Sequence, residues 1–158
     1  MALKPDRSNE YGSDISFFMN AVAERGGVVS LVTLGSGASL DNGYAVVGYG
    51  STSSGKTPVG ILMNDMVDVD LTKYQLNPYK DEVQKGGKVN IRTFGWVLTN
   101  MIKSGDTPAV DDKAYLAPDG RITKTNTGAT DSPKFGVFLS QKDQDGYAKV
   151  SFNFQGGV

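Results

Sequence analysis

The chain has 158 residues and contains neither histidine nor cysteine. Histidine is the side chain whose unperturbed pKa lies near neutrality, and it is the commonest metal ligand in proteins. Its absence excludes serine–histidine–acid catalysis and histidine-bound zinc. The absence of cysteine excludes disulfide bonds, thiolate metal sites and cysteine nucleophiles. An enzyme built on this sequence would depend on carboxylates, lysines, tyrosines or a bound cofactor.

The sequence also lacks an excess of charge of either sign and long apolar runs. Sixteen basic and 17 acidic residues give a formal net charge of −1. The basic residues do not gather into a stripe, so the sequence lacks the electrostatic footprint of nucleic-acid binding. No stretch approaches the roughly 20 apolar residues of a membrane span, and the N-terminus has no apolar core of signal-peptide length. We therefore expect a soluble chain, made in the cytoplasm, with no nucleic-acid or membrane partner.

Glycine is plentiful, with 20 residues, and turn signals recur about every ten residues along the chain. Several runs between them alternate strictly between apolar and polar residues, as a half-buried strand requires; these are residues 67–71, 88–93 and 147–154. Other runs alternate less and indicate strands buried on both faces; these are residues 28–34, 44–49, 59–63, 94–102 and 135–139. Hairpins are predicted over residues 115–122 and at Asp145-Gly146. The sequence predicts an all-β fold, a small antiparallel β-barrel or sandwich.

Residues 1–25 differ in composition from the rest, and we expect them to form an N-terminal arm before a β domain of residues 26–158. The first dozen residues are polar and rich in turn formers. Apolar residues then follow at helical spacing, which predicts a short helix through residues 20–24, capped by Ser13 or Asp14. Its apolar members are Ile15, Phe18, Met19 and Val22.

Two roles for this N-terminal segment stay open. Either the helix closes one end of the barrel, or the arm docks on another chain. An extended segment of about 25 residues spans up to about 80 Å, which is enough to reach a neighbouring subunit. In the second case the partner contacts come from apolar side chains of the arm, which are Leu3, Tyr11, Ile15, Phe17, Phe18 and Met19.

Residues 50–57 read GSTSSGKT, a full match to the phosphate-binding loop G-x-x-x-x-G-K-[ST]. In such a loop backbone N–H groups hold the phosphates, the lysine neutralises them, and a long helix begins at once. Here Pro58 and Gly60 follow, and residues 67–71 alternate, which is not a helical pattern. A turn of small residues between two strands explains the same sequence. A nucleotide enzyme is therefore an alternative that the following residues disfavour.

The remaining chemistry-bearing residues give no convergent site. Asp65, Asp68 and Asp70 form an acidic cluster, but a calcium site also needs a loop that wraps the ion. We interpret them as solvated carboxylates on a strand, and residues 143–146 as a hairpin turn. Trp96 is interpreted as a core or subunit-contact residue. The sequence predicts no catalytic residue, no metal site and no cofactor.

Several runs resemble blocks found in decoration, or cement, proteins of tailed-bacteriophage heads. They are PVGILMNDMVDVDL (58–71), LNPYKDEVQKGGKVNI (76–91), GWVLTN (95–100), AYLAPDGRIT (114–123) and FGVFLSQKDQDGYAKVSF (135–152). The resemblance covers residues 44–154 and is carried by strand patterning, turn glycines and a few aromatic positions. It does not extend to residues 1–25.

The resemblance implies a non-enzymatic β-barrel module in the virion. Such modules sit on the outer surface of the mature head, usually as homotrimers, and clamp adjacent capsomers of the major capsid protein against the pressure of packaged DNA. A dimer is the alternative assembly. A receptor-binding or head-fibre attachment module, which shares the β architecture, is the alternative function.

Overall fold

The computed structural model describes residues 3–8, 11–33, 45–65, 82–83, 85–126 and 133–154, and the structural statements below concern these residues. The strands are β1 (Leu3–Ser8), β2 (Tyr11–Met19), β3 (Ala23–Glu24), β4 (Val28–Leu31), β5 (Ala45–Gly48), β6 (Pro58–Asp65), β7 (Glu82–Val83), β8 (Lys88–Thr99), β9 (Lys113–Leu116), β10 (Ile122–Thr123), β11 (Lys134–Phe138) and β12 (Ala148–Asn153). One 3-10 turn, η1 (Pro118–Gly120), lies between β9 and β10. The predicted all-β class is confirmed.

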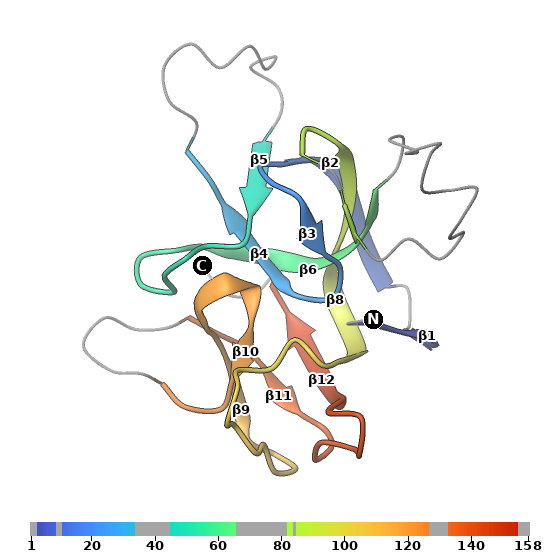
Figure 1. The fold of residues 1–158 in the computed structure, drawn as a ribbon, viewed down its shortest axis with the longest axis vertical. Helices are drawn as coiled ribbons and strands as arrows, with labels where there is room; N and C mark the ends of the chain where they lie inside the picture. Colours follow the sequence, from blue (N-terminus) through green and yellow to red (C-terminus); the bar gives the residue numbers. More distant parts are fainter. Residues whose placement is uncertain are drawn as a thin grey trace.

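Five strands close into a barrel in the order β8, β2, β5, β4 and β6, and β6 returns to pair with β8 (Figure 1). The β2–β5 pair is parallel, whereas the other neighbouring pairs are antiparallel. The backbones of β6 and β8 lie close together where the barrel closes. A Cβ atom on Gly60 would lie 2.3 Å from Cγ2 of Ile91, so a glycine is needed there. Closure removes the free edges that an open sheet exposes.

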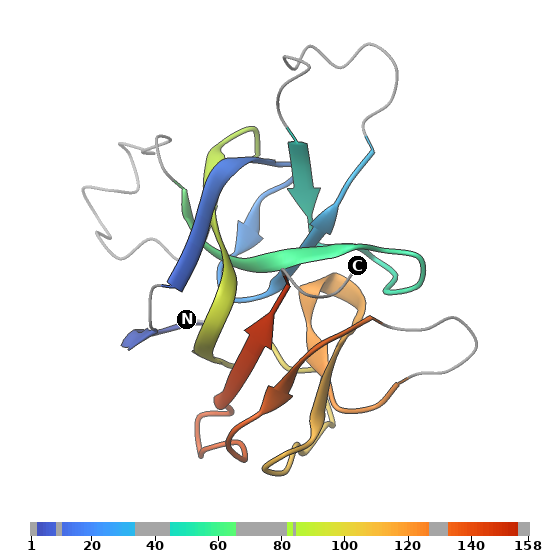
Figure 2. The ribbon, with the colours of Figure 1, turned by 180° about the vertical axis from the view of Figure 1, so that it is seen from behind.

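β8 has 12 residues and belongs both to the barrel and to a second sheet. Its first half, up to Phe94, pairs with β2 and β6, and its second half pairs with β12. The second sheet continues from β12 through β11 and β9 to β10, in the lower part of Figure 2. β1 and β12 both pair with Val97 and Thr99, so they lie on opposite edges of β8. The strands predicted at residues 88–93 and 94–102 are thus one continuous strand.

Buried apolar side chains form two clusters, and β4 and β6 contribute to both. Val28 and Ile61 pack into the cluster beneath the second sheet, whereas Val29 and Leu62 pack into the cluster that fills the barrel. These neighbouring residues point to opposite faces, because side chains alternate along a strand. The prediction of strands buried on both faces is therefore confirmed for residues 59–63 and, within 28–34, for residues 28–30 only, because Leu31 is 45% exposed.

The alternating pattern near the C-terminus also appears as predicted. Ala148, Val150 and Phe152 of β12 are buried in the cluster beneath the second sheet, and Phe154 packs against it. The ring of Phe154 stacks on that of Phe135, with centroids 5.0 Å apart. Burial of one side-chain face of β12 stabilises this strand on the sheet, together with its pairing to β11 and β8.

Both predicted hairpins are present. β9 pairs with β10 across η1, with Leu116 opposite Ile122. β11 pairs with β12 across a turn in which Gly146 has a φ of 84°, a conformation that glycine adopts without a steric penalty. The Asp143 carboxylate accepts the backbone N–H groups of Asp145 and Tyr147, at 3.0 and 2.8 Å, and so fixes the turn.

The predicted short helix through residues 20–24 is wrong. The backbone of Met19 is bonded in the barrel instead: its N–H donates to the carbonyl of Gly87, and its carbonyl accepts the N–H of Gly86. The chain then turns and enters β3, which pairs with β7. Val22, which the helical pattern placed on the apolar face, is 54% exposed. Sheet partners far along the chain thus take the backbone groups that a helix would have paired locally.

One predicted strand, at residues 67–71, lies outside the described residues. Within the described part of the chain, no helix has the length and apolar character that crossing a membrane requires.

Candidate functional site

The six predicted contact residues all lie on β1 and β2. Leu3 is on β1, and the other five are on β2. Met19 is 2% exposed and belongs to the barrel cluster, and Phe17 packs against that cluster. Phe18 is half-buried. The side chains of Leu3, Tyr11 and Ile15 fall outside the description. The structure therefore assigns Met19 and Phe17 to the core of their own chain, and partner contact by the remaining members stays a prediction.

The phosphate-loop-like segment, residues 50–57, joins β5 to β6. Pro58 begins a strand of eight residues, where a nucleotide-binding loop requires a helix. The loop is tied to η1, because the Asp119 N–H donates to the carbonyl of Gly50 at 2.7 Å. The segment is a connection between two barrel strands, as its small residues indicated.

Tyr49, directly before this loop, joins three parts of the fold. Its hydroxyl accepts the N–H of Gly27 at 3.0 Å and donates to the carbonyl of Glu24. Its ring lies against Gly120 of η1, where a Cβ atom would lie 2.3 Å from the ring. Burial raises the pKa of the Tyr49 phenol well above its ordinary value, and the nearby Glu24 carboxylate adds to this shift, while the bond from Gly27 opposes it. The hydroxyl thus stays protonated and serves as a structural donor.

The carboxylates of the described residues do not converge on a metal site. Within this part of the chain, no group of three or more aspartate or glutamate side chains is arranged to hold an ion. Asp106 instead accepts hydrogen bonds from the hydroxyl of Thr123 and the backbone N–H of Lys124. Asp65 lies at the end of β6, while Asp68 and Asp70 fall outside the description. Asp106 and Asp143 have clear structural roles in loops.

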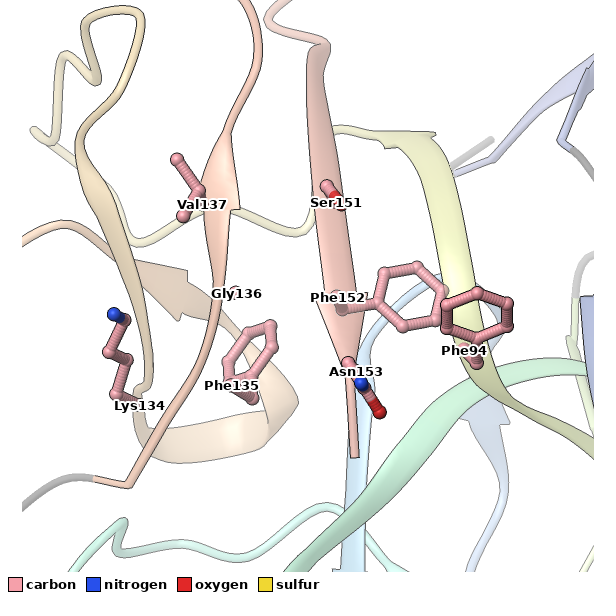
Figure 3. Close-up of a pocket in the computed structure, with 8 residues that line it drawn as sticks. All are labelled: Phe94, Lys134, Phe135, Gly136, Val137, Ser151, Phe152 and Asn153. Atoms are coloured by element: carbon pink, nitrogen blue, oxygen red, sulfur yellow. The ribbon is translucent and has the colours of Figure 1, made fainter. Parts of the chain in front are cut away.

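An open groove of about 420 Å³ lies over β11 and β12 and reaches β8. Figure 3 shows Lys134 and Phe135 on β11, Phe152 on β12 and Phe94 on β8. Phe135 and Phe152 are buried members of the core cluster, so the large exposed side chains at the groove are Phe94 and Lys134. Phe94 is 44% exposed. The other lining residues are Gly136, Val137, Ser151 and Asn153. At Gly136 a Cβ atom would lie 2.0 Å from the carbonyl oxygen of Ser151, so this glycine permits close strand packing beneath the groove.

The groove lies at one end of what we call the outer face, the side of the second sheet turned away from its core cluster. One row of this face runs from Lys113 through Val137 and Ser151 to Trp96, which are paired neighbours on β9, β11, β12 and β8. Trp96 is half-buried, and the Nζ atom of Lys149 lies 3.9 Å from its ring centroid. A cation held over the ring face in this way is favourable. Trp96 is thus an outer-face residue and not a core residue, and its contact with another subunit stays a prediction.

Sequence reasoning missed the groove and its charge. Its lining residues come from the β11–β12 hairpin and from β8, which is remote from that hairpin in the chain, so no local motif marks them. A signal was nevertheless present: KAYL, KFGVF and AKVSFN each contain one lysine, and neither they nor FGWVLT contain an acidic residue.

The comparisons with known proteins agree with this architecture. Among solved structures, the chain is similar to the N base of the head fibre protein gp8.5 of bacteriophage phi29, with 12% sequence identity and a TM-score of 0.52. The alignment covers 90% of this chain and 94% of that chain, and at this identity it shows a shared fold. A comparison with curated proteins gives no match.

The family comparison is more specific: a family model described as "Structural cement protein (E217 gp24/Pam3 gp6)" matches residues 9–153. This match and the shared fold define a capsid-associated structural protein of a phage. The chain belongs to the phage structural cement protein family. The family resemblance stated from the sequence is confirmed, but its stated extent is wrong at the N-terminal side, because the match begins at residue 9 and so includes most of residues 1–25.

Proposed function

We propose that this chain is a non-enzymatic cement that binds the outer surface of the mature phage head and stabilises contacts between capsomers of the major capsid protein. The observation that carries the proposal is the family match, which spans 9–153 and thus both the barrel and the second sheet. The composition suits a mechanical role. Without histidine or cysteine, few groups change charge or redox state under physiological conditions.

The test uses heads of the phage that encodes the chain, prepared without the protein. Purified chain is mixed with mature heads and with unexpanded precursor heads, and binding is measured by cosedimentation. We expect saturable binding to mature heads and a higher temperature for release of packaged DNA from the decorated heads. Failure to bind mature heads, or binding that leaves the DNA-release temperature unchanged, would refute the cement function.

We further propose that the N-terminal arm contributes to attachment. We keep the division into an arm of residues 1–25 and a domain of residues 26–158 as a division of function. In the fold the two parts are not separate, because β2 of the arm is also a strand of the barrel. The candidate contacts are then Leu3, Tyr11, Ile15 and Phe18, because Met19 and Phe17 pack inside the chain. Backbone pairing of β1 with a strand of the shell is one way in which such an arm binds without special side chains.

A truncation that removes residues 1–8 tests the arm. It takes away β1 but keeps β2, whose removal would open the barrel between β8 and β5. The shortened chain is expected to fold, with an unchanged far-ultraviolet circular dichroism spectrum per residue, and to bind mature heads at least tenfold more weakly. Full-strength binding would exclude β1 as a contact and leave the cement function itself intact.

We propose a homotrimer as the assembly, with a dimer as the alternative. Several arms on one oligomer raise the local concentration at each shell site, so modest individual contacts give slow release. Sedimentation equilibrium distinguishes the two assemblies, and a monomer at micromolar concentration would contradict both.

The fold shared with a head fibre base supports a second candidate, a module that attaches a fibre to the head. The two functions differ in copy number. A cement is present in hundreds of copies per particle, in a fixed ratio to the major capsid protein, whereas a fibre attachment protein occupies fewer sites. Quantitative mass spectrometry of purified virions measures this ratio.

A further inference from the structure

The outer face of the second sheet is basic on a chain that is nearly neutral. Apart from β10, this sheet consists of β9, β11, β12 and residues 94–99 of β8. Together these segments contain three lysines and no aspartate or glutamate. The whole chain has 17 acidic and 16 basic residues, so this separation of charge is local. Two nearby acidic side chains, Asp112 and Asp143, accept backbone N–H groups within their own loops.

Aromatic and aliphatic side chains lie between these lysines. Phe94 is 44% exposed at the groove, and Leu139, which follows β11, is 44% exposed as well. The Leu139 N–H donates to the carbonyl of Lys149, which places Leu139 beside β12. An exposed apolar surface edged by charges of one sign is typical of a protein-binding site.

We propose that this groove and outer face bind an extended, acidic segment of the capsid shell, with an apolar side chain against Phe94 and a carboxylate beside Lys134. This inference rests on the proposed cement function and adds the contact surface and the chemistry of the partner segment. The groove volume of about 420 Å³ suits a short stretch of extended chain.

The spacing of the groove constrains the bound sequence. Neighbouring strands lie about 4.8 Å apart, so β11 and β8, with β12 between them, are separated by about 10 Å. Side chains two positions apart in an extended segment point the same way and lie about 7 Å apart. The long Lys134 side chain covers the remaining distance. The segment therefore carries an apolar residue and an acidic residue at positions i and i+2.

A nucleic acid would also be attracted to lysines and aromatic rings, but the geometry favours a peptide. Binding to single strands uses open ring faces on which bases stack, together with a groove of positive charge that follows the backbone. The Trp96 ring is covered by Lys149, at 3.9 Å from the centroid. The groove itself has one lysine, and its other accessible lining side chains, among them Phe94 and Val137, are uncharged. This arrangement suits one carboxylate better than a run of phosphates.

The experiment measures binding of the full chain to mature heads prepared without it, at 50 and 300 mM salt. The test variants are Lys134→Glu and the milder Lys134→Gln, and Phe94→Ser removes the apolar contact. Lys85→Glu is the matched control, because Lys85 is exposed in the turn before β8 in the barrel. Urea unfolding of each variant checks that the fold is retained, which exposed positions should allow.

We expect Lys134→Glu to weaken head binding at least tenfold at 50 mM salt, Lys134→Gln and Phe94→Ser to weaken it by smaller factors, and Lys85→Glu to change it less than twofold. The loss caused by Lys134→Glu should shrink at 300 mM salt, because salt screens the pairing of exposed charges.

Wild-type binding that is retained by Lys134→Glu would overturn the inference while the cement function stands. Absence of wild-type binding would defeat the cement function, and the inference with it. A fluorescent single-stranded oligonucleotide provides the last arm: tight binding that Lys134→Glu abolishes would identify a nucleic-acid site in place of a peptide site.

Discussion

The Tyr49 hydroxyl is expected to be a major local source of stability, and Tyr49→Phe tests this. The substitution removes one oxygen atom from a ring that otherwise keeps its contact with Gly120. It leaves the buried N–H of Gly27 without its acceptor. An unsatisfied buried donor costs about 1–3 kcal/mol, whereas the Glu24 carbonyl, which is bonded at an exposed site, regains a partner from water. The expected loss in the free energy of unfolding is about 2 kcal/mol.

Urea unfolding followed by tryptophan fluorescence measures this loss. With a slope of about 2 kcal/mol per molar urea, the midpoint should fall by about 1 M. Tyr115→Phe serves as the matched control, because Tyr115 is half-buried on β9 and its replacement should change stability by less than about 0.5 kcal/mol. If Tyr49→Phe and Tyr115→Phe shift the midpoint equally, the structural role of the Tyr49 hydroxyl is wrong.

The pH dependence of the same difference is a second, independent check. Burial raises the pKa of Tyr49 in the folded state above the value of about 10 that it has when unfolded. Above pH 10 the unfolded chain loses the phenol proton while the folded chain keeps it, so the contribution of this group to stability falls as pH rises. The free energy of unfolding of the wild type should exceed that of Tyr49→Phe by a constant amount below pH 9. Above pH 10 this difference should decline by up to about 1.4 kcal/mol per pH unit. An advantage that stays constant up to pH 11.5 would refute the assigned burial.

Three further substitutions test the barrel closure, a buried polar contact and the loop. Gly60→Ala should cost at least about 2 kcal/mol in urea unfolding, because the new Cβ atom overlaps the side chain of Ile91. Thr99→Val should cost about 1–3 kcal/mol in the same assay, since it leaves the carbonyl of Gly26 without its buried donor. Lys56→Ala and the wild type should both show no change in melting temperature with magnesium and ATP; stabilisation of the wild type alone would revive the nucleotide alternative.

Period-two patterning identified strands whose two faces differ in burial, such as residues 148–153. Proline is tolerated in the first turn of a helix, so the evidence against a phosphate-binding loop came from Gly60 and from the alternation at residues 67–71. The structure adds a reason for Gly60 that the pattern does not contain: it allows β6 to approach Ile91 where the barrel closes. Glycine as a turn or break signal is visible locally, whereas glycine as a space requirement depends on a partner strand 30 residues away.

The predicted helix shows where local pattern is insufficient. The spacing of Ile15, Phe18 and Met19 fits a helix, but Phe17 and Met19 fit an alternating strand equally well. The choice is made by backbone partners, including the carbonyl of Val47, which accepts the N–H of Asn20. Such long-range pairing is absent from a window of ten residues. The groove was missed for the same reason, because Phe94 and Lys134 become neighbours through β12.

The proposed arm contact and the proposed outer-face contact lie on opposite sides of the second half of β8, and this separation has a measurable consequence. β1 pairs with one edge of the second half of β8, whereas Lys134 lies on β11, two strands beyond the opposite edge. Three strand spacings of about 4.8 Å place the two sites about 14 Å apart. Free-energy effects at sites separated by more than about 10 Å, with no shared partner, are additive. Removal of residues 1–8 and Lys134→Glu should therefore weaken head binding by factors that multiply in the double variant, when cosedimentation is used to measure each affinity. A double variant no weaker than the worse single variant would mean that both changes disrupt one common contact, and the arm and the outer face would then have to be treated as a single binding surface.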